Sequence, residues 1–111
     1  MAMETNAAVP ISEQAERRQG RELVEMIARF RRDLTNSTVM LKDLTRFGAR
    51  IDGIGALETD EAVTLTLPGC RPLMAFVAWS TDHCAGLEFA EPLEDSVFTE
   101  LVAGYGLGQA A

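Results

Sequence analysis

Cysteine is scarce in this sequence, and long apolar segments are missing from it. Cys70 and Cys84 are its two cysteines, too few and too far apart for a disulfide scaffold or a four-cysteine zinc site, so we expect reduced thiols. No apolar run approaches the roughly 18 residues of a membrane-spanning helix, and the first residues lack the basic and apolar regions of a secretory signal. These absences predict a cytoplasmic protein with no membrane contact.

An excess of positive charge is also lacking. The 111 residues carry a formal net charge of -7, which argues against binding to a nucleic acid polymer or an anionic membrane. The charges are unevenly distributed, because all Lys and Arg residues lie between Arg17 and Arg71 and only acidic charges follow Arg71. Such a chain can still hold a small anion near its basic part.

Short apolar segments separated by Gly, Pro, Asp and Asn dominate the middle of the chain and predict a mainly β fold. Val24 begins an alternating segment in which Ile27 is the exception, and the residues of DLTNS form the next turn. Leu73–Trp79 is apolar at every position, which predicts a strand covered on both faces with Met74, Phe76 and Trp79 in the core. Six strands at this spacing predict a small antiparallel β-barrel. The expected strands start at Val24 and then occupy residues 39–44, 49–51, 62–67, 73–79 and 86–90.

After the last strand the apolar period changes from strand-like to helical. Pro92 suits the first position of a helix and Gly104 suits its end, so residues 92–104 are predicted as a C-terminal helix. The helical face consists of Leu93, Val97, Phe98, Leu101 and Val102.

Two short motifs flank the first two strands. The segment ERRQGR places Arg17 and Arg21 four residues apart, and DLTRFG places Asp43 and Thr45 ahead of Gly48. Each motif is weak alone, because spaced arginines and acid-hydroxyl-glycine turns are common. In this order and spacing, before and within a six-stranded barrel, they resemble the PilZ domain family, whose second motif usually has serine at the position of Thr45. The resemblance extends over about residues 16 to 93.

The resemblance implies a stand-alone receptor for cyclic di-GMP, with no other cofactor and no catalytic activity. It divides the chain into a flexible tail (1–13), a PilZ domain (14–104) and a second tail (105–111); within the domain it implies an arginine loop (14–23), a barrel (24–91) and a helix (92–104). Binding would order the arginine loop and relay the signal to an unidentified effector protein; the oligomeric state is left open. The implied ligand-binding residues are Arg17, Arg18, Arg21, Asp43, Thr45, Arg46 and Gly48.

The chemistry of these side chains fits that ligand. A guanidinium group can donate two hydrogen bonds to guanine O6 and N7 or to phosphate oxygens, and it can stack on a purine. The Asp43 carboxylate can accept from the guanine N1–H and amine, and Thr45 can offer its hydroxyl. Asp43 and Thr45 are two residues apart, which predicts one strand face for both.

Two other hypotheses remain open. A PilZ-type barrel could serve only as a protein-interaction adaptor that binds no nucleotide. A thiol-dependent or metal-dependent enzyme would need Cys70 or Cys84 beside His83, although neighbouring residues of a tight turn rarely reach that geometry. Arg50 could extend the binding surface or face water. Arg29, Arg31, Arg32 and Lys42 are expected on a solvated strand face.

Overall fold

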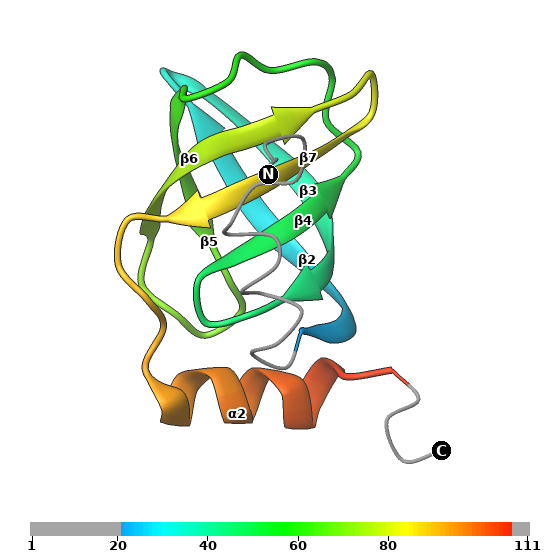
Figure 1. The fold of residues 1–111 in the computed structure, drawn as a ribbon, viewed down its shortest axis with the longest axis vertical. Coiled ribbons are helices and arrows are strands. Elements are labelled where there is room, and N and C mark those ends of the chain that lie inside the picture. Colours follow the sequence, from blue (N-terminus) through cyan, green and yellow to red (C-terminus); the bar gives the residue numbers. More distant parts are fainter. Residues whose placement is uncertain (1–20, 108–111) are drawn as a thin grey trace, which may run out of the picture.

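The fold is a closed β-barrel followed by one helix, seen in a computed structural model that describes residues 21–107 (Figure 1). The strands are β2 (Glu22–Arg32), β3 (Thr35–Leu44), β4 (Gly48–Asp52), β5 (Ala62–Thr66), β6 (Leu73–Ser80) and β7 (Cys84–Phe89), and the helix is α2 (Asp95–Tyr105). The barrel order is β2-β3-β4-β7-β6-β5, with β5 pairing back to β2 and every pair antiparallel. The predicted fold class, a six-stranded antiparallel barrel with a C-terminal helix, is confirmed.

Alternation along the strands fills the inside of the barrel with apolar side chains. Val24, Met26, Ala28 and Phe30 of β2 are buried, whereas Ile27 points outward and is 60% exposed. Full burial of one such large side chain contributes about 1.5–3 kcal/mol. The interior is therefore the source of stability, and the outer face is free to carry the polar chemistry.

The turn between β2 and β3 is shorter than predicted. The strands are joined at Asp33 and Leu34, and Arg32 pairs directly with Thr35. Asp33 has a φ of 55°, a left-handed conformation that aspartate tolerates better than most residues. One residue of this kind closes the hairpin, so the rest of the predicted loop continues as strand.

The prediction that β6 is covered on both faces is wrong. Met74 is 57% exposed, Phe76 38% and Trp79 41%. Met74 and Phe76 alternate with the buried Ala75 and so point outward. The Trp79 position follows from a register shift: Val77 pairs with Leu87 but Trp79 with Gly86, which leaves one extra residue on β6 and turns Trp79 outward.

The helix covers one end of the barrel (Figure 1). It begins later than predicted, since Glu94 is its extended N-cap and Pro92 precedes it. It also continues through Gly104 to Tyr105, and the Gly106 N–H donates to the Val102 carbonyl at 2.8 Å. The predicted apolar face is correct: Leu93 and Leu101 are buried, and Val97, Phe98 and Val102 pack against the core.

The residues after the helix return to the barrel. Gly106 forms an antiparallel bridge with Val24, and the Leu107 N–H donates to the Leu23 carbonyl at 2.9 Å. The start of the predicted C-terminal tail is thus part of the fold. Within residues 21–107, no helix has the length and apolar character needed to cross a membrane.

Candidate functional site

A β-bulge at the end of β3 brings Asp43 to the outer face of the barrel. Leu41 pairs with Ile51, but the next pair is Asp43 with Arg50, so Lys42 is an extra residue on β3. Without this shift Asp43 would share the inward direction of Leu41. Bulges re-aim side chains in this way, often beside functional sites.

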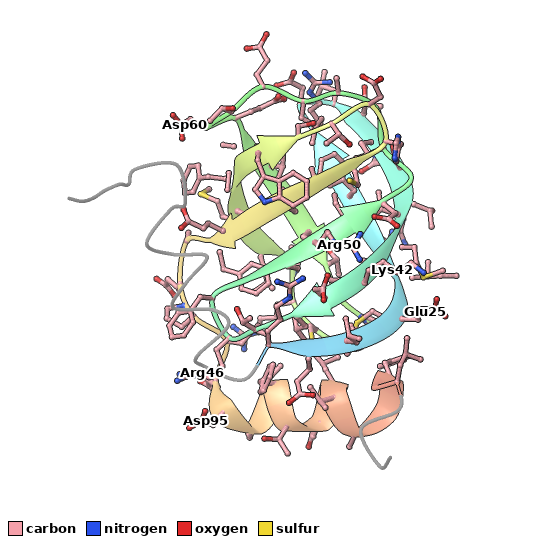
Figure 2. The ribbon with its side chains drawn as sticks, turned by 45° about the vertical axis from the view of Figure 1, so that its right-hand side comes forward. Glu25, Lys42, Arg46, Arg50, Asp60 and Asp95 are labelled. Carbon is pink, nitrogen blue, oxygen red and sulfur yellow. The ribbon has the colours of Figure 1, made fainter. Side chains whose placement is uncertain are left out.

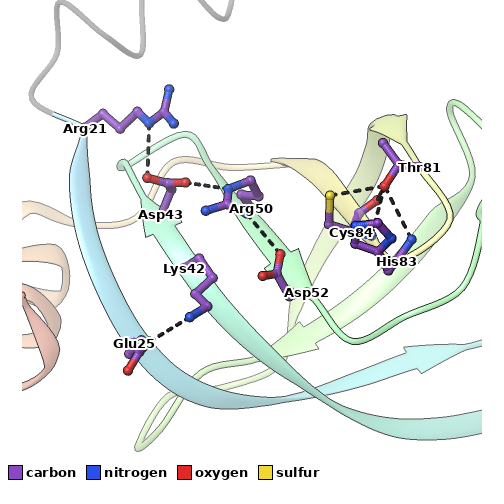
Figure 3. A network of polar contacts seen from close by, with 9 residues as sticks. All are labelled: Arg21, Glu25, Lys42, Asp43, Arg50, Asp52, Thr81, His83 and Cys84. Atoms are coloured by element: carbon purple, nitrogen blue, oxygen red, sulfur yellow. Dashed lines mark hydrogen bonds and ion pairs between the residues drawn. The ribbon is translucent and has the colours of Figure 1, made fainter.

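The Asp43 carboxylate is held between two guanidinium groups (Figure 3). Arg50 Nε donates to Oδ2 at 2.6 Å and Arg21 Nε donates to Oδ1 at 3.2 Å, while the Asp43 side chain is only 6% exposed. Arg50 also reaches Asp52 Oδ1, 3.0 Å from one of its terminal nitrogens. A carboxylate with so little access to water requires partners of this kind.

The two arginines differ in how firmly they are held. Arg50 lies within β4 and bonds two carboxylates, and its hydrogen bond to Asp43 raises the pKa of Arg50. Arg21 directly precedes β2, its side chain is 37% exposed, and its contact with Asp43 is the longer one. The two side chains are similarly exposed, at 37% and 34%, so the shorter contact and the second carboxylate are what distinguish Arg50 from Arg21.

A single cross-strand row connects this cluster to the tryptophan. Asp43 pairs with Arg50, Arg50 with Gly86, and Gly86 with Trp79, across β3, β4, β7 and β6. The indole lies on Gly86, where an added Cβ would be 2.2 Å from Trp79 Nε1. The row therefore offers a carboxylate, a guanidinium and a partly exposed aromatic ring on one surface.

Thr45 occupies the turn after β3 and does not lie on the strand. Its hydroxyl oxygen accepts hydrogen bonds from the N–H groups of Phe47 and Gly48, at 2.9 and 3.0 Å, and the residue is 2% exposed. The prediction of one strand face for Asp43 and Thr45 is thus wrong, because β3 ends at Leu44. The hydroxyl shapes the turn that leads into β4, a role that serine can also fill.

Arg46 is directed away from the Asp43 cluster. Its Nε donates to the Leu93 carbonyl at 2.8 Å and lies 3.2 Å from Asp95 Oδ1, at the start of α2. Figure 2 shows Arg46 and Asp95 together at the helix, apart from Arg50. The guanidinium carbon is also 5.7 Å from the centre of the Phe47 ring. In this conformation Arg46 fastens the β3–β4 turn to the helix.

Comparison with known proteins assigns neither a family nor a function to this chain. No protein-family model matches this chain, and no curated protein sequence matches it.

The structure brings together only part of the predicted binding set. Arg21 meets Asp43, whereas Arg17 and Arg18 lie outside the described residues. The sequence left open whether Arg50 joins the binding surface or faces water. A hairpin between β3 and β4 indicates the answer, because the residues next to the Leu44–Ala49 pair, away from the turn, are Asp43 and Arg50.

The turn between β6 and β7 contains Cys84 and His83, which a thiol-dependent or metal-dependent enzyme would use. Cys84 Sγ is 3.2 Å from Thr81 Oγ1, and the main-chain N–H of His83 donates to the same hydroxyl at 3.3 Å (Figure 3). In the described part of the chain, no three His, Cys, Asp or Glu residues form a cluster that could hold a metal ion. These contacts order the turn around Thr81.

Proposed function

We propose that this chain is a PilZ-type receptor that binds cyclic di-GMP on the outer barrel face around Asp43 and performs no catalysis. The observation that carries the proposal is the nearly buried Asp43 carboxylate shared by Arg21 and Arg50. The sequence motifs led to Arg21 and Asp43, and we add Arg50 and Trp79 as proposed ligand contacts because they lie in the same cross-strand row.

The site matches the edges of guanine and the charge of phosphate. Each oxygen of the Asp43 carboxylate has a second lone pair, so it can accept from the guanine N1–H and amine while Arg50 stays bound. A released guanidinium can donate two hydrogen bonds to O6 and N7 or to a phosphate. The site therefore has acceptors for the guanine N–H groups and donors for its O6, N7 and phosphate oxygens.

Ligand binding would proceed by exchange at Asp43. Access to the carboxylate would require one guanidinium to leave. We expect Arg21 to leave, because its contact with Asp43 is the longer one, at 3.2 Å, while Arg50 also bonds Asp52. Arg21 then bonds the ligand, and the guanine takes its place on Asp43. The exchange replaces one charge-assisted hydrogen bond by others, which keeps its cost low.

Trp79 would provide a stacking surface for a base. Trp79 is 41% exposed, its indole lies against Gly86, and Gly86 separates it from Arg50 in the cross-strand row. Stacking of a base on an aromatic side chain contributes about 1–3 kcal/mol. The indole would therefore add binding free energy without distinguishing one base from another by its hydrogen-bonding groups.

The receptor proposal includes relay to an effector protein from the cytoplasm. Arg17 and Arg18 would add contacts from the arginine loop, which becomes ordered on binding in this scheme. Both cysteines are free thiols, as fits a reducing compartment.

One observation favours the adaptor alternative. Thr45 and Arg46, two of the predicted ligand contacts, are engaged in the turn and at the helix. A barrel whose motif residues serve only its own structure could dock proteins without nucleotide.

Calorimetric titration with cyclic di-GMP separates the two functions. We expect saturable binding by the parent chain and a loss of about 10- to 150-fold for Arg21→Ala, equivalent to about 1.5–3 kcal/mol for a charged hydrogen bond. Arg29→Ala removes the same charge near the opposite end of β2 and should bind as the parent does. Absence of binding by the folded parent would favour the adaptor, and unchanged binding by Arg21→Ala would contradict the proposed site.

A further inference from the structure

The outer face of β5 is the floor of a hollow on another side of the barrel. The hollow has a volume of about 390 Å³. Its floor is low because Thr64 and Thr66 are short, while Arg29 and Arg31 of β2 rise on one side and Met74 of β6 on the other. In the barrel order β5 lies opposite β4, so this hollow is separate from the Asp43 cluster.

One rim of the hollow carries positive charge without carboxylate partners. Arg29 and Arg31 are both exposed, and neither forms an ion pair within residues 21–107. Arg31 Nε donates to the main-chain oxygen of Asp33 at 3.1 Å, and the Asp33 side chain marks the hairpin end of the hollow. The cations that do have a carboxylate within reach are Arg21, Arg32, Lys42, Arg46 and Arg50.

The opposite rim is apolar and accessible. Met74 is 57% exposed and Phe76, next on the same face of β6, is 38% exposed. Pro72 extends this rim beyond the strand. Exposed large apolar side chains beside unpaired cations on a chain of net charge -7 are typical of an interaction surface.

The floor excludes an added strand and favours a helix. β5 pairs with β2 on one side and with β6 on the other, so its edges are occupied. An extended peptide lying on this face would leave its own backbone groups without partners, whereas a helix satisfies them internally. Five strand residues measure about 16 Å, the length of about 11 helical residues.

We propose that this hollow is the docking groove for an acidic amphipathic helix of a partner protein. Carboxylates of the helix would face Arg29 and Arg31, and its apolar side chains would pack on Met74 and Phe76. The α2 helix of a second copy does not supply it, because the apolar face of α2 is packed against its own barrel. Docking here does not depend on nucleotide binding, so either proposal can fail without the other.

The test uses a hydrocarbon-stapled helical peptide of about 14 residues, with Glu along one side and Leu along the other, because short free helices are marginal in water. Its binding to the full chain is measured by fluorescence anisotropy. The double substitution Arg29→Gln/Arg31→Gln should weaken binding about three- to tenfold, as expected for two exposed charge pairs. Ser96→Glu/Thr99→Glu lowers the net charge equally on the exposed side of α2 and should change it less than about twofold.

Two further measurements locate the peptide. In amide NMR spectra, addition of the peptide should shift Thr64, Thr66 and Met74, and a peptide with Lys in place of every Glu should shift none of them. Met74→Ser should weaken binding of the acidic peptide. Equal binding of both peptides, equal weakening by both double substitutions, or shifts confined to other strands would each overturn the proposal.

Discussion

Gly86→Ala is the substitution that tests the aromatic end of the proposed site. An ideal Cβ at Gly86 would lie 2.2 Å from Trp79 Nε1 and 2.5 Å from Cε2. Ordinary van der Waals contact begins at 3.4 Å, so the indole must move by at least 3.4 minus 2.2, or 1.2 Å. The indole is 41% exposed and can swing toward solvent, which lets the strand remain in place.

The expected changes in stability and in binding differ in size. Overpacking costs about 1–3 kcal/mol, and the reduced freedom of the unfolded chain offsets about 0.4–1 kcal/mol of it. A net loss of about 1 kcal/mol in the free energy of unfolding follows. Loss of a stacked base would cost about 1–3 kcal/mol of binding free energy, which is about 5- to 150-fold in Kd for cyclic di-GMP.

Two assays on one protein sample measure both quantities. Urea unfolding gives the stability, and emission of Trp79, which is the single tryptophan of the chain, reports both the indole environment and nucleotide binding. Trp79→Ala, followed by calorimetry, should lose a similar binding energy, and combining it with Gly86→Ala should add little, since both remove one contact. Parent-like affinity and emission in Gly86→Ala would show that the indole neither moves nor stacks on the ligand.

Substitutions at three further places test the supporting structure. Thr45→Val should lower the free energy of unfolding by about 1–3 kcal/mol because two N–H groups of the turn lose their acceptor; Thr45→Ser keeps that oxygen, and urea unfolding should show the smaller loss. The hydrogen bond from Arg32 lowers the pKa of Glu61 below 4.5. The ion pair of Glu61 with Arg32 therefore stabilises the fold fully above that pH, and this contribution is lost as the pH falls through the pKa of Glu61 in the folded state. In acid unfolding series, the free energy of unfolding of Glu61→Gln should vary less below pH 4.5 than that of the parent. Burial and the charge of Glu100 raise the pKa of Cys70 above 9.0, so iodoacetamide should alkylate Cys70 more slowly than a fully exposed cysteine thiol. Mass spectrometry should show faster alkylation of Cys70 in Glu100→Gln.

The barrel and its helix were predictable because most strands bury one face. In β2 the alternation of apolar and polar residues is regular, and Ile27 is an outward exception without consequence. The helix period in residues 93–102 identified the buried face correctly. Its ends were misplaced because Gly104 can remain helical and Leu93 is buried before the helix begins.

The parts that could not be predicted depend on β-bulges. One shift turns Asp43 outward on β3, and another turns Trp79 outward on β6. Regular alternation along each strand would point both side chains into the barrel, because it takes no account of the extra residue at a bulge. A bulge has no reliable signature in a single sequence. Trp79 was therefore placed in the core, and Arg50 was left undecided between the binding surface and water. The motifs singled out Arg21 and Asp43, and the structure pairs these two side chains.

NMR of the guanidinium Nε–Hε groups measures directly whether Arg21 leaves Asp43 for the ligand while Arg50 stays. On saturation with cyclic di-GMP, the Arg21 Nε–Hε resonance should shift strongly, and that of Arg50 should stay near its position in the free protein. The same amount of GMP, with one phosphate and one base, serves as the control and should produce a smaller change. An Arg21 resonance that stays unchanged at saturating cyclic di-GMP would contradict the proposed exchange at Asp43.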